Sequence, residues 1–87
     1  MIRYTVLWSP QAEDELAKIW CDYPDRRAIS MATDHIDAEL ATDAHQKGFP
    51  MPNRARAISS GPLSAFYRVI EADCKVLVAC VQLTEVN

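Results

Sequence analysis

The chain of 87 residues has only two glycines and three cysteines, and its longest apolar run, Val76 to Val81, is short. With so few glycines, no glycine-rich phosphate-binding loop is visible. The cysteines form neither a CxxC pair nor the Cys/His spacing of a zinc site, so we expect buried or half-buried thiols and no metal. The apolar run falls far short of the roughly 20 residues that cross a bilayer. These features predict a cytoplasmic protein with no membrane partner and no cofactor.

What the chain does contain favours one folded domain over residues 1–87. Hydrophobic residues make up 49% of the sequence, and low-complexity or repeated segments are absent. A chain of this length can bury roughly 60–65% of the surface that its unfolded form exposes, which is enough for one small core. We therefore expect no linker and no second domain.

The net charge of −3 is unevenly distributed along the chain. Residues 9–47 hold nine acids and four bases, a net charge of −5, whereas the remaining residues hold five bases and three acids, a net charge of +2. One interpretation of this asymmetry is that acidic side chains keep exposed helix faces soluble. The other interpretation is a weakly basic sheet face that meets an anionic partner.

The first residues have the pattern of a strand, and a helix follows them. Alternating side chains predict a strand over residues 3–8. Ser9 and Pro10 form a strong helix start, because a serine side chain caps orphan backbone N–H groups and proline fits the first helical position. Apolar residues then recur at helical spacing until Pro24, so we expect a first helix from about residue 10 to residue 22.

A second helical pattern begins after Asp25, a good capping residue, and runs to Gly48 and the prolines beyond it. Because only a short turn separates the two helical patterns, we expect a helical hairpin that packs both apolar stripes on one face of a sheet. This hairpin builds the core rather than a chemical site. His35 and His45 are expected on the second helix as surface histidines, with His45 the better candidate for a functional role.

Three more strands are predicted over residues 54–60, 64–71 and 76–83, separated by turn sequences. Strands in such close succession should form an antiparallel meander. The last strand is apolar on both faces, so we expect it to be central, with helices on one side and another covering on the other side. In so small a chain, that covering can be a partner protein.

The predicted order is βααβββ, an α+β fold with a two-helix hairpin on a mainly antiparallel four-stranded sheet. This order, the opening from Tyr4 to Leu16, and the strand sequences Arg56–Gly61, Phe66–Ile70 and Lys75–Val78 resemble the RelE/ParE toxin superfamily of bacterial type II toxin–antitoxin systems. The resemblance covers nearly the whole chain, with motifs of medium specificity. It implies a compact toxin, or plasmid-stabilisation protein, that a cognate antitoxin holds inactive. Some members of the superfamily are ribosome-dependent mRNA endonucleases, and others poison DNA gyrase.

RNA cleavage needs a base for the ribose 2′-hydroxyl, an acid for the leaving oxygen and cations for the phosphate. Arg54 and Arg56 are expected on one face of their strand, and the resemblance places Arg56 about where the family carries a phosphate-binding residue. Arg68, beside Tyr67, is the second cation, since a guanidinium fits a phosphate. The candidate catalytic residues are therefore Arg56, Arg68 and Tyr67, and the candidate binding residues are Arg54, Arg56, Arg68 and Lys75. Ordinary surface pairing with nearby acids is the alternative role for these arginines.

The end of the chain departs from the nuclease members, which carry a basic residue beyond the last strand and a terminal Tyr or His. Here residues 81–87 are neutral or acidic, and the negative net charge disfavours the ribosome as a target. We therefore favour a toxin that binds a macromolecular target such as gyrase. Whether the protein is an enzyme stays open, with a non-enzymatic role favoured because the expected acid–base residues are not evident at the C-terminus. A toxin-like binding module without toxicity is the second hypothesis, mRNA cleavage is less supported, and a small-molecule enzyme is least supported.

The favoured hypothesis also predicts how the antitoxin binds. A short amphipathic helix or edge strand should cover the apolar side of the sheet and direct its acids toward Arg54, Arg56 and Arg68. Without this cover, the protein is expected to form a homodimer, to aggregate or to bind hydrophobic dye.

Overall fold

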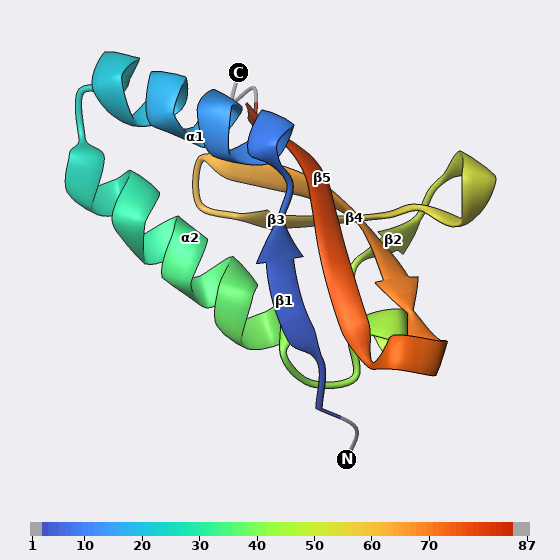
Figure 1. The fold of residues 1–87 in the computed structure, drawn as a ribbon. Coiled ribbons are helices and arrows are strands. Elements are labelled where there is room, and N and C mark those ends of the chain that lie inside the picture. The colour runs from blue at the N-terminus through green and yellow to red at the C-terminus, as the bar shows by residue number, and fades with distance from the viewer. Residues whose placement is uncertain (1–2, 85–87) are drawn as a thin grey trace.

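The computed structural model describes residues 3–84, which form two helices and a five-stranded sheet (Figure 1). The expected α+β fold is confirmed, but the sheet has five strands rather than four because Phe49 and Pro50 pair with Ala57 and Arg56. A strand of two residues is too short for alternation to reveal it. The elements are β1 (Thr5–Trp8), α1 (Pro10–Asp22), α2 (Arg26–Leu40), β2 (Phe49–Pro50), β3 (Arg56–Ser60), β4 (Leu63–Ile70) and β5 (Lys75–Leu83).

The strands are ordered β1-β5-β4-β3-β2 across the sheet. Strand β1 runs parallel to β5, and every other neighbouring pair is antiparallel. The predicted meander is therefore present as β3, β4 and β5. Strand β5 lies between β1 and β4, as its apolar sequence predicted.

Helix α1 has the bounds that the sequence predicted. The Ser9 hydroxyl oxygen accepts a hydrogen bond from the backbone N–H of Ala12 at 3.1 Å and donates one to the carbonyl oxygen of Ala79 at 2.9 Å. Ala79 lies where the pairing of β4 with β5 shifts register, opposite the Phe66/Tyr67 step. The Ser9 side chain thus caps α1 and joins the first turn of this helix to β5.

The prediction that the second helix continues to Gly48 was wrong, because α2 ends at Leu40. Its start agrees with the sequence, since the Asp25 carboxylate accepts from the backbone N–H of Ala28. After the helix, the carbonyl oxygen of Ala41 accepts from the backbone N–H of Tyr4 at 2.7 Å. This long-range contact draws the chain alongside the N-terminal segment, and His45 consequently lies in a separate 3₁₀ turn over Ala44–Gln46.

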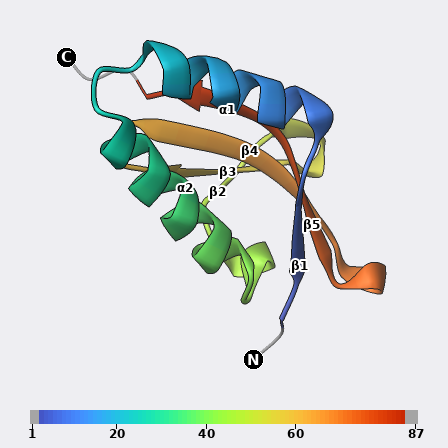
Figure 2. The ribbon, with the colours of Figure 1, turned by 60° about the vertical axis from the view of Figure 1, so that its left-hand side comes forward.

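Both helices pack on one face of the sheet, as Figures 1 and 2 show. The core between these layers contains Ile29, Ile36 and Leu40 from α2 and alternate residues of β4 and β5. The thiols differ from the sequence-based expectation: Cys80 is half-buried, but Cys21 and Cys74 are exposed. Cys21 lies one residue beyond the apolar stripe of α1. Cys74 lies in the turn before β5, and its backbone has a left-handed conformation.

None of the helices within residues 3–84 is long and apolar enough to cross a membrane.

Candidate functional site

The predicted basic residues do not form one cluster. Arg54 lies in a 3₁₀ turn over Pro52–Arg54, outside the strand, and both Asn53 and Arg54 have positive φ angles, 62° and 63°. The prediction that Arg54 and Arg56 share one face of a strand was therefore wrong. Arg54 is exposed on the loop that projects from the sheet between β2 and β3 (Figure 1).

Arg56 is held against the loop that follows α2. It pairs across β3 and β4 with Tyr67, so both side chains are on the side of the sheet that faces the helices. The Arg56 Nε donates to the carbonyl oxygen of Lys47 at 2.6 Å, and one terminal guanidinium nitrogen donates to the carbonyl oxygen of Gly48 at 3.4 Å. Arg56 therefore has a structural role, because its guanidinium binds two carbonyl groups of the loop that follows α2.

Tyr67 is fully buried, and two carbonyl oxygens share the single proton of its hydroxyl, that of Lys47 at 2.7 Å and that of Ala44 at 3.0 Å. Burial raises the pKa of the Tyr67 phenol, and the neighbouring Arg56 opposes this shift only in part. The phenol therefore remains a neutral donor at neutral pH. In this position Tyr67 is a fixed support for the loop and has no access to an external substrate.

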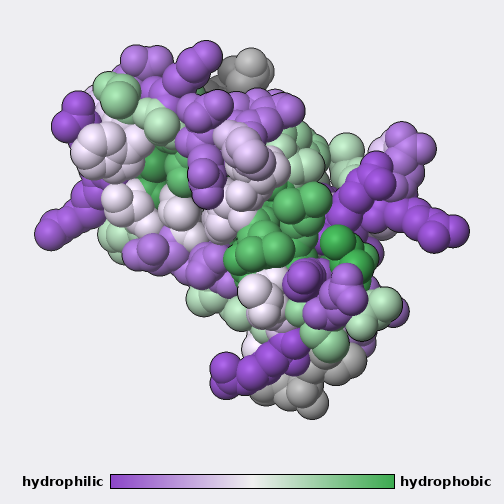
Figure 3. All heavy atoms as spheres, viewed as in Figure 1, coloured by the Kyte–Doolittle hydropathy of each residue, from purple (hydrophilic) through white to green (hydrophobic). Residues whose placement is uncertain are grey.

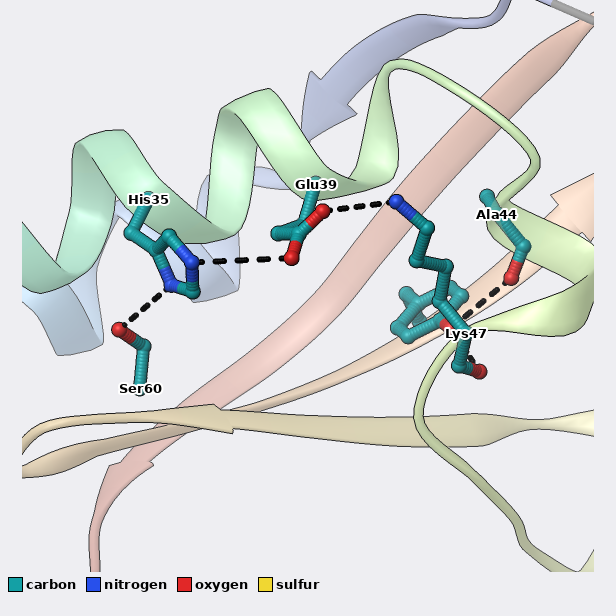
Figure 4. A network of polar contacts seen from close by, with 6 residues as sticks. His35, Glu39, Ala44, Lys47 and Ser60 are labelled. Atoms are coloured by element: carbon teal, nitrogen blue, oxygen red, sulfur yellow. Dashed lines mark hydrogen bonds and ion pairs between the residues drawn. The ribbon is translucent and has the colours of Figure 1, made fainter. Parts of the chain in front are cut away.

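A chain of polar contacts continues from this loop along α2 (Figure 4). The Lys47 ammonium lies 2.7 Å from Glu39, the other carboxylate oxygen of Glu39 lies 3.6 Å from the Nε2 of His35, and the Nδ1 of His35 lies 2.9 Å from the Ser60 hydroxyl. The pairing with Lys47 lowers the pKa of the Glu39 carboxyl group. These contacts join the end of β3, helix α2 and the following loop. The pair of His35 with Glu39 has the i,i+4 spacing of neighbours on a helix and could have been predicted, whereas the contact of His35 with Ser60 joins residues that lie far apart in the sequence.

Both histidines thus have partners. His35 is exposed, as predicted, whereas His45 is only half-exposed and its Nδ1 lies 3.0 Å from the hydroxyl of Tyr4. Among residues 3–84, no group of His, Cys, Asp and Glu could hold a metal ion.

The remaining two candidates, Arg68 and Lys75, lie on the opposite side of the sheet from Arg56 and Tyr67. Strand alternation and the register of β4 with β5 place Arg68 beside Leu77 and place Lys75 beside Ile70. Neither cation has an ion pair within the described part of the chain. We call this side the outer face; its strand residues are Thr5, Leu7, Phe49, Ala57, Ser59, Ser64, Phe66, Arg68, Ile70, Lys75, Leu77, Cys80 and Gln82.

Seven of the thirteen strand residues of the outer face are apolar, and neither α1 nor α2 covers this face. Leu7, Ile70 and Phe49 on it are 44%, 40% and 76% exposed. Figure 3 shows a hydrophobic patch over β1 and β5 with polar residues around it. The sequence predicted an apolar side of the sheet without a helical cover, and the outer face is such a side. The sequence grouped Arg54, Arg56 and Arg68 as the cations beside it, but the structure separates them, and only Arg68 is a strand residue of the outer face.

A groove lies between the two helices. This helix groove has a volume of about 480 Å³ and an apolar floor that includes Leu16, Trp20 and Ile29. The acidic residues Glu13 and Asp34 also line it. The guanidinium of Arg26 lies over the ring of Trp20 at 4.4 Å, so the groove has a neighbouring cation as well as its two carboxylates.

No protein-family model and no curated protein sequence matches this chain. Solved structures do match it. A chain of the toxin–antitoxin complex RelBE2 from Mycobacterium tuberculosis is 18% identical, with a TM-score of 0.79 over 97% of this chain and 94% of that chain. A chain of the chromosomal ParDE toxin–antitoxin system from P. aeruginosa is 15% identical, with a TM-score of 0.72 over 98% of this chain and 100% of that chain.

The same fold also occurs within a longer chain. TrmO from P. aeruginosa is 22% identical, with a TM-score of 0.59 over 91% of this chain but only 33% of the TrmO chain. The matches to the chains of RelBE2 and ParDE, in contrast, extend over nearly the full length of this chain and of the matched chain. The likeness is to the arrangement of the elements, since the sequence identities are low. The protein has the fold of the RelE/ParE toxins.

Proposed function

We propose that this protein is the toxin component of a type II toxin–antitoxin system and that it acts by binding a macromolecular target. A cognate antitoxin neutralises it by covering the outer face. The RelE/ParE toxin-like fold supports the first part of this proposal, because the structures that match over nearly their whole length come from toxin–antitoxin complexes. We further propose that the protein works in the cytoplasm and helps to maintain the replicon that encodes it.

One observation carries the choice of binding over RNA cleavage. Arg56 and Arg68, the two candidate phosphate ligands, lie on opposite sides of the sheet. The phenol of Tyr67, the candidate proton-transfer group, is buried and donates to two carbonyl oxygens. A cleavage site needs an acid, a base and a cation around one phosphate. These three candidates do not surround any common point.

Two alternatives have the same fold. The first is a toxin-like binding module that forms a complex but harms no cell, which differs from a toxin only in the effect of expression. The second is a ribosome-dependent mRNA endonuclease. It would require a catalytic set other than Arg56, Arg68 and Tyr67, and the outer face supplies Arg68 and Lys75 as its cations. Gyrase and the ribosome remain the candidate targets of the toxin and endonuclease hypotheses, respectively.

The experiment that tests the proposed function is tightly controlled expression in a bacterial host, with and without the adjacent small reading frame. Growth arrest that the neighbour relieves is the expected result. Unimpaired growth at high levels of folded protein would favour the binding module without toxicity.

Two additional variants separate binding from cleavage. Arg68→Ala removes the exposed cation of the outer face, and Arg27→Ala removes an exposed cation from α2 as a matched control. Mapping of mRNA 5′ ends during arrest should show no new cleavage sites in the wild type. New cleavage sites that Arg68→Ala abolishes and Arg27→Ala retains would contradict the proposal and support the endonuclease.

A further inference from the structure

We propose that the helix groove binds small organic cations that have an apolar body, such as arylalkyl ammonium ions. This site is separate from the surface used by the proposed function, because α1 and α2 pack on the face of the sheet opposite to the outer face (Figure 2). The size of the groove, the side chains of its floor and the charges at its edge all match a ligand of this class.

The helix groove has the size and composition of a small-molecule site. Its volume of about 480 Å³ lies within the roughly 300–1,000 Å³ of ligand pockets, which are mostly apolar and contain a few polar groups. Nine residues line the groove, whereas each side of a standard protein interface contributes roughly 20–30 residues. The groove is therefore large enough for one small molecule and small for a protein partner.

The floor of the groove offers apolar and aromatic contacts to the body of a ligand. Leu16 and Trp20 come from α1, and Ile29 comes from α2. Trp20 is 40% exposed, so part of its indole ring is open to a ligand. Thr33 also lines the groove, but its hydroxyl donates to the carbonyl oxygen of Ile29 at 2.8 Å and is thereby used within the helix. Affinity at the floor therefore depends mainly on apolar surface.

The charges at the edge of the groove favour a cation. Glu13 of α1 and Asp34 of α2 both line it, so each helix supplies one carboxylate. Both residues are exposed, and neither carboxylate has an ion pair or a side-chain hydrogen bond within the described part of the chain. The described lining contains no lysine, arginine or histidine. A positive ligand is thus attracted to this edge, and a negative one is repelled.

The contact between Arg26 and Trp20 shows that the aromatic wall of the groove holds a cation. The guanidinium carbon of Arg26 lies 4.4 Å from the centroid of the Trp20 ring, within the roughly 6 Å over which an aromatic face attracts a positive charge. Arg26 does not line the groove itself, but its guanidinium covers part of the ring. A ligand cation and Arg26 would therefore compete for the same ring.

A second copy of this chain fits the groove poorly. A two-fold contact through the groove would place Glu13 and Asp34 against the same acids of the other copy. Like charges that face each other in an interface cost free energy. Residues 9–47 as a whole have a net charge of −5, so the surroundings of the groove add to this repulsion.

The test uses three probes with the same apolar body: phenylbutylammonium, phenylbutanol and phenylbutyrate. Binding to the ¹⁵N-labelled full chain is followed by NMR at the indole Nε1–H of Trp20, which a spectrum of Trp8→Phe assigns. We expect saturable binding of the ammonium probe with a Kd of about 1 mM or lower. The carboxylate probe should bind about tenfold more weakly, because its charge is reversed beside two carboxylates.

Charge variants locate the site. Glu13→Gln combined with Asp34→Asn removes both carboxylates of the groove and should weaken the ammonium probe about fivefold, while phenylbutanol binds as before. The matched control is Asp14→Asn combined with Asp22→Asn, which removes two exposed acids of α1 that do not line the groove. This control changes the net charge by the same amount and should leave the affinity nearly unchanged.

Arg26→Ala tests the proposal in the opposite direction. It uncovers the ring of Trp20 and removes a like charge, so the ammonium probe should bind about threefold more tightly. Arg27→Ala removes the adjacent exposed arginine, which has no contact with the ring, and should have a smaller effect. Circular dichroism should show the same thermal transition for every variant that is compared.

Four results would overturn the proposal. They are no saturable shift of the Trp20 Nε1–H, equal affinities for the ammonium and carboxylate probes, equal losses in the groove variant and its matched control, and shifts confined to the amides of β3 and β4. The last result would place the probe on the sheet instead of the helices.

Discussion

Arg56 and Tyr67, cross-strand neighbours on β3 and β4, donate hydrogen bonds to the same carbonyl oxygen, that of Lys47, at 2.6 and 2.7 Å. The pair fixes the loop between α2 and β2 to the side of the sheet that faces the helices. Side chains in this arrangement support the fold, and the surface for partners is left to the opposite side of the sheet. The roles that a nuclease would need are thereby separated in space.

Substitution of Tyr67 by phenylalanine tests this structural role. Tyr67→Phe removes the hydroxyl donor, but the carbonyl of Ala44 keeps the backbone N–H of Lys47 as a donor and the carbonyl of Lys47 keeps the Arg56 Nε. We expect the free energy of unfolding to fall by about 0.5–1.5 kcal/mol, the net contribution of one hydrogen bond. Urea denaturation measures the change. Tyr23→Phe, at a half-buried tyrosine whose hydroxyl makes no hydrogen bond within the described chain, is the matched control.

The same variant distinguishes structure from chemistry. If Tyr67 acts only as a support, growth arrest by Tyr67→Phe should weaken only as far as the folded population does. Full stability together with complete loss of arrest would contradict the structural role.

Replacement by alanine should destabilise the protein more at Gly48 than at Gly61. Gly48 has a φ angle of +68°, and an added Cβ would overlap the carbonyl oxygen of Ala57 and lie 3.2 Å from the Tyr67 hydroxyl. Gly61 has a similar φ angle of +53°, but its Cβ would meet only the Ala32 methyl group, at 3.7 Å. Gly61→Ala should therefore cost about 1 kcal/mol from backbone strain alone, and Gly48→Ala should cost more.

Thermal or urea unfolding of the two alanine variants measures this difference. Equal losses of stability would mean that the loop around Gly48 can move away from β3, and that the contacts of Arg56 and Tyr67 do not hold it rigidly.

The pairing of Glu39 with Lys47 predicts a pH dependence of stability. The hydrogen bond and the charge of Lys47 lower the pKa of the Glu39 carboxyl group in the folded protein. The unfolded state then binds the proton more tightly, so the stabilisation is present above the ordinary pKa of about 4.3 and is lost as the pH falls through the lower folded value. Because the pair is partly exposed, the effect should be small and should shrink in high salt.

Urea unfolding of the wild type and of Glu39→Gln at a series of acidic pH values checks this prediction. The difference between the two proteins should narrow as the pH drops. Glu13→Gln, which removes an exposed carboxylate of α1 that has no ion pair in the described chain, should show no such narrowing. A constant difference between wild type and Glu39→Gln would show that Lys47 does not hold the carboxylate in solution.

Local signals made much of the fold predictable. Helix α1 was placed correctly because its start depends on adjacent residues, Ser9 and Pro10, and its end on Pro24. The end of α2 was not predictable, because the hydrogen bond from Tyr4 to Ala41 joins segments that lie far apart in the sequence. Helical periodicity alone continued past Leu40, and tertiary contacts decided the boundary.

The candidate site was only partly predictable, for a similar reason. In β4 the alternation of Leu63, Ala65, Tyr67 and Val69 already indicates that Tyr67 points to the core and that Arg68 points away from it. The position of Arg56 required the pairing of β3 with β4, which the sequence does not state. Pro52 and Asn53 are residues typical of turns, and asparagine tolerates a left-handed backbone, so the sequence did contain a signal that Arg54 lies outside the strand.

The contact between Glu15 of α1 and Val81 of β5 leads to a further prediction. The Glu15 carboxylate accepts a hydrogen bond from the backbone N–H of Val81 at 3.0 Å. Strand β1 ends at Trp8 and its register with β5 ends at Val78, so Val81 has no partner on that edge. Glu15→Ala leaves this N–H unsatisfied and should lower the free energy of unfolding by about 1–3 kcal/mol. Glu15→Gln keeps an acceptor oxygen and should cost less. Hydrogen exchange at the Val81 amide should be faster in Glu15→Ala than in Glu15→Gln, and equal exchange in the two variants would show that the carboxylate does not protect β5.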